Sequence, residues 1–172
     1  NITYIDGDGF TITDDLKGTG LECGTWHIVR NSYTDENFFM ASTSSFTTPG
    51  KANDWMITPV IKIYGKGSKL SWKSMSLSKV KKDGLKVYVS TTGNSIKDFE
   101  ASPLFSIESE EAGNWQTHEV SLDQYAGQQI YVAFVNDTYN KYVLCLDDIE
   151  ITGPTPDATF SIATPIMTDT GK

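Results

Sequence analysis

Two pairs of aspartates near opposite ends of the chain have the side chains that bind a hard cation. Asp6 and Asp8 alternate with glycines in IDGDGF, and Asp147 and Asp148 interrupt the apolar run YVLCLDDIEI. A carboxylate inside a strand is costly to bury unless a charge or a metal compensates it. Carboxylates and backbone carbonyls suit Ca²⁺ better than Zn²⁺. We therefore predict one structural calcium site from these four aspartates, if the first and last strands are neighbours.

A hairpin turn competes with a metal site as the interpretation of the first loop. An Asp-Gly pair between apolar residues is also a favoured hairpin turn. An EF-hand is excluded, because Phe10 and Lys17 occupy positions where that loop needs oxygen ligands. Alternation in a strand points Asp147 and Asp148 to opposite faces unless a bulge intervenes. Asn53 and Asp54 lie in another acidic loop, where an N-cap or Asx-turn role is favoured over metal binding.

Signatures of catalysis are missing from the sequence. The two histidines, His27 and His118, lie within alternating strand patterns, and GxSxG, HExxH, GxxxxGK[ST] and GxGxxG motifs do not occur. Glu108, Glu110 and Glu111 are interpreted as a solvated loop rather than as a glycosidase pair. We expect a protein that is not an enzyme.

Composition narrows the class of partner. The 172 residues carry a formal net charge of −8, with 21% charged and 38% hydrophobic residues. An acidic chain repels nucleic acid, so nucleic acid is not expected as a partner. The sequence contains no run of about 18 apolar residues, so membrane insertion is not expected either. Cys23 and Cys145 are too few for a cysteine zinc site, and either one disulfide or two buried free thiols remains open.

Short segments with period-two alternation, rich in β-branched and aromatic residues, predict nine or ten strands separated by glycine turns. The segments are 26–30, 38–42, 56–64, 69–77, 85–90, 104–108, 115–122, 130–136 and 142–152. A single helical turn is expected at 94–99. Two antiparallel sheets packed as a β-sandwich follow, in one domain over 1–153. The proline-rich segment 154–172 is expected to be a linker, and to begin a following domain or add an edge strand.

Five segments, in this order, resemble the cleaved-adhesin family, also called choice-of-anchor J domains, known from gingipain-type proteases. They are IDGDGFTI, ANDWMITPVIKI, LKVYVSTTGNSIKDF, NWQTHEVSLDQYAGQQIYVAFVND and LCLDDIEI. The resemblance covers about residues 1–153. It implies a jelly-roll sandwich related to MAM and galactose-binding-like domains, structural calcium and a non-catalytic adhesive role. The family's acidic first loop corresponds to Asp6 and Asp8, and its terminal aspartates to Asp147 and Asp148.

Aromatic residues supply the candidates for ligand binding, because flat rings stack on sugar faces beside a few polar groups. The four tryptophans lie at strands and are expected in the core. Tyr33, Tyr139 and Tyr142 lie in polar, loop-like contexts and are the predicted ligand-binding residues. The predicted function is a calcium-stabilised, secreted or cell-surface module of a larger bacterial protein, monomeric and binding a glycan or a host protein. The alternative is an accessory carbohydrate-binding domain of a secreted hydrolase.

Overall fold

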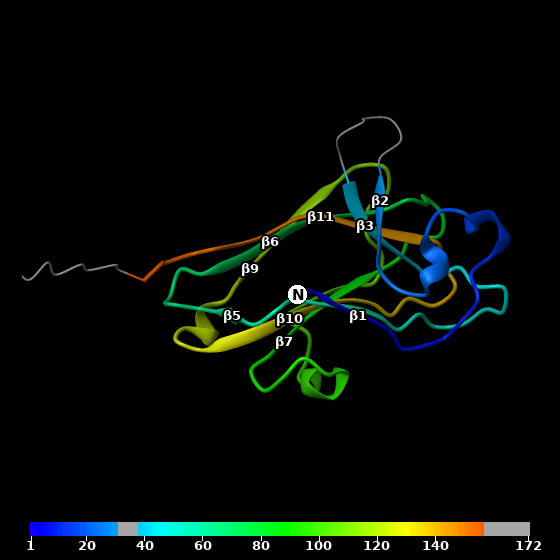
Figure 1. Ribbon diagram of the computed structural model, residues 1–172. Helices are drawn as coiled ribbons and strands as arrows, with labels where there is room; N and C mark the ends of the chain where they lie inside the picture. Colours follow the sequence, from blue (N-terminus) through cyan, green and yellow to red (C-terminus); the bar gives the residue numbers. More distant parts are fainter. Residues whose placement is uncertain (31–37, 157–172) are drawn as a thin grey trace, which may run out of the picture.

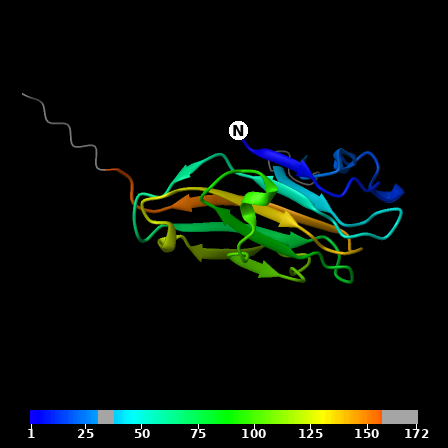
Figure 2. The same cartoon turned by 90° about the horizontal axis from the view of Figure 1, so that it is seen from below.

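Alternating burial along the strands builds the two layers of the molecule. The computed structural model describes residues 1–30 and 38–156, which form eleven strands in two antiparallel sheets that face each other (Figures 1 and 2). Strand β6 (Lys69–Ser76) shows the pattern clearly, since Leu70, Trp72 and Ser74 are buried between less buried neighbours. The all-β sandwich predicted from the sequence is confirmed.

One sheet has six strands in the order β1-β4-β10-β7-β8, with β5 also paired to β10. These strands are β1 (Thr3–Asp6), β4 (Asp54–Ile57), β5 (Ile61–Lys62), β7 (Leu85–Ser90), β8 (Phe105–Ile107) and β10 (Gln129–Asn136). The expected strand 56–64 is thus two strands, because Pro59 between them has no N–H to donate to a ladder.

The second sheet has five strands in the order β2-β3-β11-β6-β9. Its other members are β2 (His27–Arg30), β3 (Phe38–Thr43), β9 (Gln116–Ser121) and β11 (Val143–Thr152). The register of β11 against β6 shifts between Asp147 and Glu150, and Asp148 has a φ of +48°. A bulge therefore lies at Asp148, and it interrupts the alternation that would point Asp147 and Asp148 to opposite faces of the sheet.

Three groups of buried side chains form the core, one between the sheets and one on the outer face of each sheet. The largest fills the space between the sheets around Trp72, Phe134 and Leu144. A second lies around Cys145 and Ala41 and includes residues of the 3-10 turns η1 (Asp14–Leu16) and η2 (Leu21–Cys23). The third lies around Trp55, under the 3-10 turn η3 (Ile96–Phe99). Strand β4 is therefore buried along its whole length.

The helical turn expected at 94–99 is present as η3, which a reciprocal capping box between Ser95 and Asp98 stabilises. Another single turn, η4 (Asp123–Tyr125), precedes β10. Helices of the described residues are all this short, and none is long or apolar enough to cross a membrane. The segment 154–172 falls almost wholly outside the described residues.

The two cysteines are both free thiols, so the disulfide alternative is wrong, and the alternative of two buried thiols holds for Cys145 but not for Cys23. Cys145 in β11 is buried as expected, and burial raises the pKa of its thiol to about 12. Cys23 at the end of η2 is exposed. The two lie on different elements, and the register places Ala41 of β3 opposite Cys145.

We expect only one thiol of the native protein to react quickly with a chromogenic aromatic disulfide, because only Cys23 meets the solvent. Absorbance of the released thiolate should show one equivalent in buffer and two in denaturant. Cys23→Ser should remove the fast phase, whereas Cys145→Ser should leave it unchanged. Two fast equivalents in buffer would contradict the burial of Cys145.

Candidate functional site

An acidic cluster forms where β1 meets β4. Asp6 ends β1 and Asp54 begins β4, and the two are direct partners across the antiparallel pair. One carboxylate oxygen from each of Asp6, Asp8 and Asp54 lies within 4.8 Å of the other two. Like charges opposite each other destabilise a pair of strands. The cluster therefore needs a proton or a cation to neutralise it.

Asp54 is the buried member of this cluster, with only 2% of its surface exposed. Its Oδ2 accepts a 2.6 Å hydrogen bond from the Ser42 hydroxyl of the opposite sheet. Its Oδ1 is buried and has no hydrogen-bond partner among the described residues. Burial raises the pKa of Asp54 to about 8, and the charges of Asp8 and Asp6 add to this effect. A lone buried acceptor beside two carboxylates marks the inner wall of the cluster.

Asp6 and Asp8 are held in place by the loop that they begin. Asp6 Oδ1 accepts hydrogen bonds from the backbone N–H groups of Asp8 (2.9 Å) and Gly9 (2.8 Å). Asp8 accepts one from Phe10 N–H (2.8 Å) and one from Asn53 N–H (2.7 Å), which ties the loop to the segment before β4. The hairpin interpretation of IDGDGF is wrong, because β1 pairs with β4 and the segment after the loop bridges Phe46 through Ile12. The loop is instead fixed by hydrogen bonds to its own aspartates.

Gly24 closes the outer side of the cluster. Its φ of +78° is in the left-handed region, where glycine is favoured. A Cβ at Gly24 would collide with Oδ2 of Asp6. Nearby, the Trp26 indole N–H donates to the backbone carbonyl of Asp54 at 3.1 Å. The segment before β2 therefore packs directly against two of the three aspartates.

Asp147 and Asp148 do not join this cluster, contrary to the adjacency expected from the sequence. They lie in β11, between β3 and β6 of the five-stranded sheet, whereas β1 pairs with β4 of the other sheet. Asp148 instead forms a 2.7 Å ion pair with Lys73. The residue that completes the cluster is Asp54, to which the sequence assigned a capping or turn role. The available sequence signal for a buried carboxylate at this position was that Asp54 directly precedes the apolar residues of DWMI.

A chain of buried polar groups extends from Asp54 across the sandwich. The Asn136 side-chain amide donates to the Ser42 hydroxyl at 3.0 Å, and Ser42 donates to Asp54. Further along, Asp83 is fully buried and accepts from the Ser44 hydroxyl at 2.5 Å. Burial raises the pKa of Asp83 to about 6, while hydrogen bonds from Ser44, Tyr142 N–H and Asn136 act in the opposite direction. These groups join the two sheets at the end of the molecule that carries the cluster.

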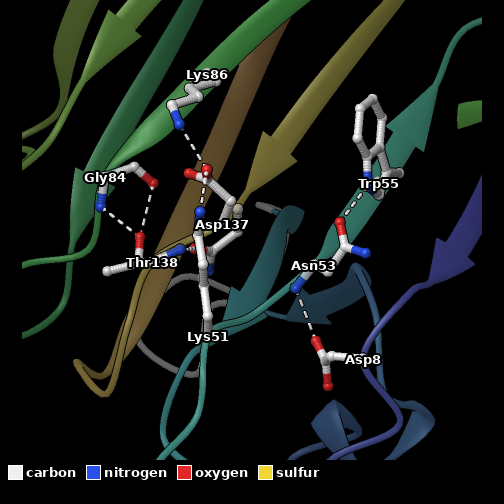
Figure 3. A network of polar contacts seen from close by, with 9 residues as sticks. Asp8, Lys51, Asn53, Trp55, Gly84, Lys86, Asp137 and Thr138 are labelled. Carbon is white, nitrogen blue, oxygen red and sulfur yellow. Dashed lines mark hydrogen bonds and ion pairs between the residues drawn. The ribbon is translucent and has the colours of Figure 1, made fainter. Parts of the chain in front are cut away.

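A polar groove opens beyond the end of β10, on the outer face of the six-stranded sheet. Lys51 and Lys86 both reach Asp137, at 3.1 and 2.5 Å from its Oδ2 (Figure 3). Thr138 receives a 2.9 Å hydrogen bond from Gly84 N–H and returns one to the Gly84 carbonyl. Tyr139 lines the same groove, with 58% of its surface exposed.

The predicted aromatic residues have different surroundings. Tyr139 lies in the groove, whereas Tyr142 is half-buried and packs against the cluster around Cys145. Tyr33 lies outside the described residues. Trp55 stacks on Tyr88 with ring centroids 5.6 Å apart and donates to Asn53 Oδ1 at 2.7 Å. Trp26, Trp55 and Trp72 are buried, as expected for core residues, whereas Trp115 is only half-buried.

The prediction of a solvated 108–111 loop is wrong for Glu110, which is 1% exposed. Its Oε2 accepts from the Ser74 hydroxyl at 2.5 Å and lies 2.7 Å from His118 Nε2. Serine and histidine thus meet the same carboxylate rather than each other, so His118 is not placed as a base for Ser74. These groups anchor the loop onto the five-stranded sheet.

Comparison with known proteins identifies the family. The sequence profile of the MAM domain (meprin/A5/mu) matches residues 18–155, which is most of the chain. The chain belongs to the MAM domain family. No curated protein matches this MAM domain.

Solved structures of adhesin modules are similar to this MAM domain. The K3 cleaved adhesin domain of Lys-gingipain from Porphyromonas gingivalis is 25% identical, with a TM-score of 0.63 over 87% of this chain and 88% of that chain. The K1 domain is 21% identical, with a TM-score of 0.61 over 90% and 91%. The predicted resemblance to cleaved-adhesin modules and the jelly-roll fold are therefore confirmed.

A carbohydrate-binding module shares the same fold. The family 11 module from Clostridium thermocellum, solved with a β-1,3-1,4-mixed-linked tetrasaccharide, is 14% identical, with a TM-score of 0.52 over 89% of each chain. At this identity the likeness concerns the fold alone. The MAM domain described here thus shares its architecture with cleaved adhesin domains and with a carbohydrate-binding module.

Proposed function

We propose that this MAM domain is a non-catalytic binding module of a secreted or cell-surface bacterial protein, which recognises an extracellular glycan and is stabilised by Ca²⁺ held by Asp6, Asp8 and Asp54. The observation that carries the calcium proposal is Oδ1 of Asp54, which is buried without a hydrogen-bond partner in the described structure and belongs to a group of three carboxylates. A buried polar atom without a partner is rare and needs a ligand, such as an ion.

The chemistry of the cluster suits Ca²⁺. Its ligand atoms are all carboxylate oxygens, which are hard donors, and the described residues offer no histidine or thiol within the group. Ca²⁺ accepts six to eight oxygens in flexible geometry, so loop carboxylates and water can complete its shell. Mg²⁺ demands stricter octahedral geometry. The role of the bound Ca²⁺ would be structural, because it would join the first loop and edge strand β1 to β4.

The glycan part of the proposal rests on the groove of this chain. Tyr139 offers an exposed ring beside a carboxylate and two ammonium groups. Such a combination of one flat ring and a few fixed polar groups is typical of sugar sites. The oligosaccharide bound by the clostridial module supports the view that this fold serves glycan recognition.

Thermal unfolding of chelator-treated protein, in EDTA, Mg²⁺ or Ca²⁺, tests the calcium proposal. A ligand that binds only the folded state at about 100 times its Kd contributes about 2.7 kcal/mol, which corresponds to roughly 5 to 10 °C for a chain of this size. We expect a rise of this order in Ca²⁺ and little change in Mg²⁺. Asp54→Asn and Asp6→Ala should abolish the rise.

The control variants are Asp147→Asn and Asp148→Asn, which should keep the full response because β11 lies in the other sheet. Asp54→Asn should fold in EDTA, since it removes a carboxyl that resists burial as an anion. Equal melting in Ca²⁺ and EDTA would overturn the calcium proposal. A response lost only in the Asp147 or Asp148 variants would move the site to β11.

A further inference from the structure

The groove beyond β10 consists of two adjoining depressions of about 440 and 340 Å³. Lys51 and Asp137 line both, and therefore stand at the junction between them. Tyr139 lines the larger depression, and Asn53 and Asp8 line the smaller one. Their combined volume offers room for more than one ring of an extended ligand.

Tyr139 provides the flat apolar surface of the groove. It is 58% exposed, and no ring contact with another described residue involves it. Its backbone forms an isolated bridge with Lys51, and Asn140 N–H donates to the Gly50 carbonyl at 3.1 Å. The ring therefore stands on a braced loop rather than on a loose one, which lowers the entropy cost of binding a ligand.

The charged side chains that line the two depressions balance one another, because three lysines (Lys51, Lys86 and Lys141) accompany three carboxylates (Asp8, Glu108 and Asp137). The Asp137 carboxylate, 23% exposed, receives the ammonium groups of both Lys51 and Lys86 on the same oxygen. Strand alternation supports this placement, since Asn136 faces the interior and the next residue faces outward. An anionic ligand would have to compete with Asp137 for the lysines, and a cation would meet both ammonium groups.

A hydroxyl group fits this pair of charges because it donates to a carboxylate and accepts from an ammonium at the same time. The net charge of −8 further disfavours polyanionic ligands. We propose that the groove binds a neutral pyranose of a glycan, with one ring face on Tyr139 and hydroxyls on Asp137, Lys51 and Lys86. This inference rests on the proposed glycan-binding function and names its site and ligand class.

Titration of ¹⁵N-labelled protein with neutral tetrasaccharides of glucose, xylose, galactose and mannose, in Ca²⁺, tests this assignment. At least one sugar should shift the backbone amides around Asp137 and Tyr139, and tetragalacturonate should shift them less at equal concentration. Calorimetry should show at least a tenfold weaker affinity for Tyr139→Ala and for Asp137→Asn. Tyr64→Ala is the matched control, because Tyr64 is 52% exposed near β5, away from the groove, and should bind like the native protein.

The outcomes separate this inference from the calcium proposal. Tyr139→Ala should keep the calcium-dependent rise in melting temperature, which shows that the variant is folded. Unchanged sugar affinity in Tyr139→Ala, preference for tetragalacturonate, amide shifts confined to another face, or no binding of any neutral sugar would each overturn the groove assignment. Failure to bind any neutral sugar would also count against the proposed glycan recognition, whereas amide shifts on another face would leave that function standing. A missing calcium response would count against the calcium part of the proposed function alone.

Discussion

Calcium-free protein is expected to lose roughly 2 to 3 kcal/mol of unfolding free energy between pH 6 and pH 8. The cause is Asp54, whose usual pKa of 3.8 rises to about 8 because the carboxyl is buried. In this pH range the carboxyl binds a proton in the folded state and not in the unfolded state, so stability falls as the pH rises. The slope for one such group is about 1.4 kcal/mol per pH unit.

The sign follows from the direction of the shift. A carboxyl with a raised pKa contributes stability that is fully present below about pH 4 and lost as the pH reaches about 8. Asp83 acts in the same direction, but its pKa of about 6 leaves it only a small contribution, confined to the acidic end of this window. Denaturant titrations at pH 6, 7 and 8 in EDTA give the slope. Saturating Ca²⁺ should remove it, because the ion favours the ionised carboxylate.

Asp54→Asn isolates this effect, since it cannot titrate and leaves the histidines in place. The difference in slope between native protein and Asp54→Asn is the contribution of Asp54. If both proteins show the same dependence on pH in EDTA, the carboxyl of Asp54 is not protonated in the folded state. A flat profile for the native protein that remains flat in Ca²⁺ would lead to the same conclusion.

Trp72→Ala is expected to lower the unfolding free energy by about 3 to 5 kcal/mol, as for other large aromatic residues truncated in a core. Trp72 is 1% exposed and makes edge contacts with Phe105 and Phe134, at ring-centroid distances of 4.9 and 5.7 Å. It belongs to β6, whereas Phe105 and Phe134 belong to the other sheet. Its loss would leave a cavity between the two layers. Urea unfolding monitored by far-UV circular dichroism measures the change.

The comparison variant is Trp115→Ala. Trp115 is half-buried, and its ring contact is with Phe39 at 5.9 Å in the smaller outer cluster, so about 1 to 2 kcal/mol is expected. Trp72→Phe should lose less than Trp72→Ala, because it keeps a ring and removes an indole N–H that has no partner among the described residues. Equal losses for Trp72→Ala and Trp115→Ala would show that the space between the sheets does not dominate stability.

The strands could be predicted because alternation is a local property. The expected strand at 85–90 coincides with β7, and those at 69–77 and 130–136 differ from β6 and β10 by one residue. Such patterns report which side chains face the core. They do not report which strand lies beside which, so the fold class followed from the sequence while the order of strands did not.

The candidate metal site shows where local information ends. Asp6 and Asp8 were found because glycines isolate them in a polar loop, but their partner depends on the pairing of β1 with β4. If the first and last strands were adjacent, Asp148 would lie beside Asp6 and Asp8 in place of Asp54. Nothing in the sequence around Asp54 indicates that Asp6 stands opposite it. Tyr139 and Tyr142 likewise share a polar segment, and only tertiary packing separates an exposed ring from a half-buried one.

The positions of β1 and β11 in their sheets give the two ends of the domain unequal mechanical strength. Strand β11 is paired on both sides, so a force applied at Thr152 must shear two ladders at once. Strand β1 is an edge strand held by four residue pairs, and a force applied at Asn1 loads that single ladder. An ion shared by Asp6 and Asp54 would clamp the end of this ladder. Under tension, calcium would therefore protect the N-terminal attachment of the domain and leave the C-terminal attachment unchanged.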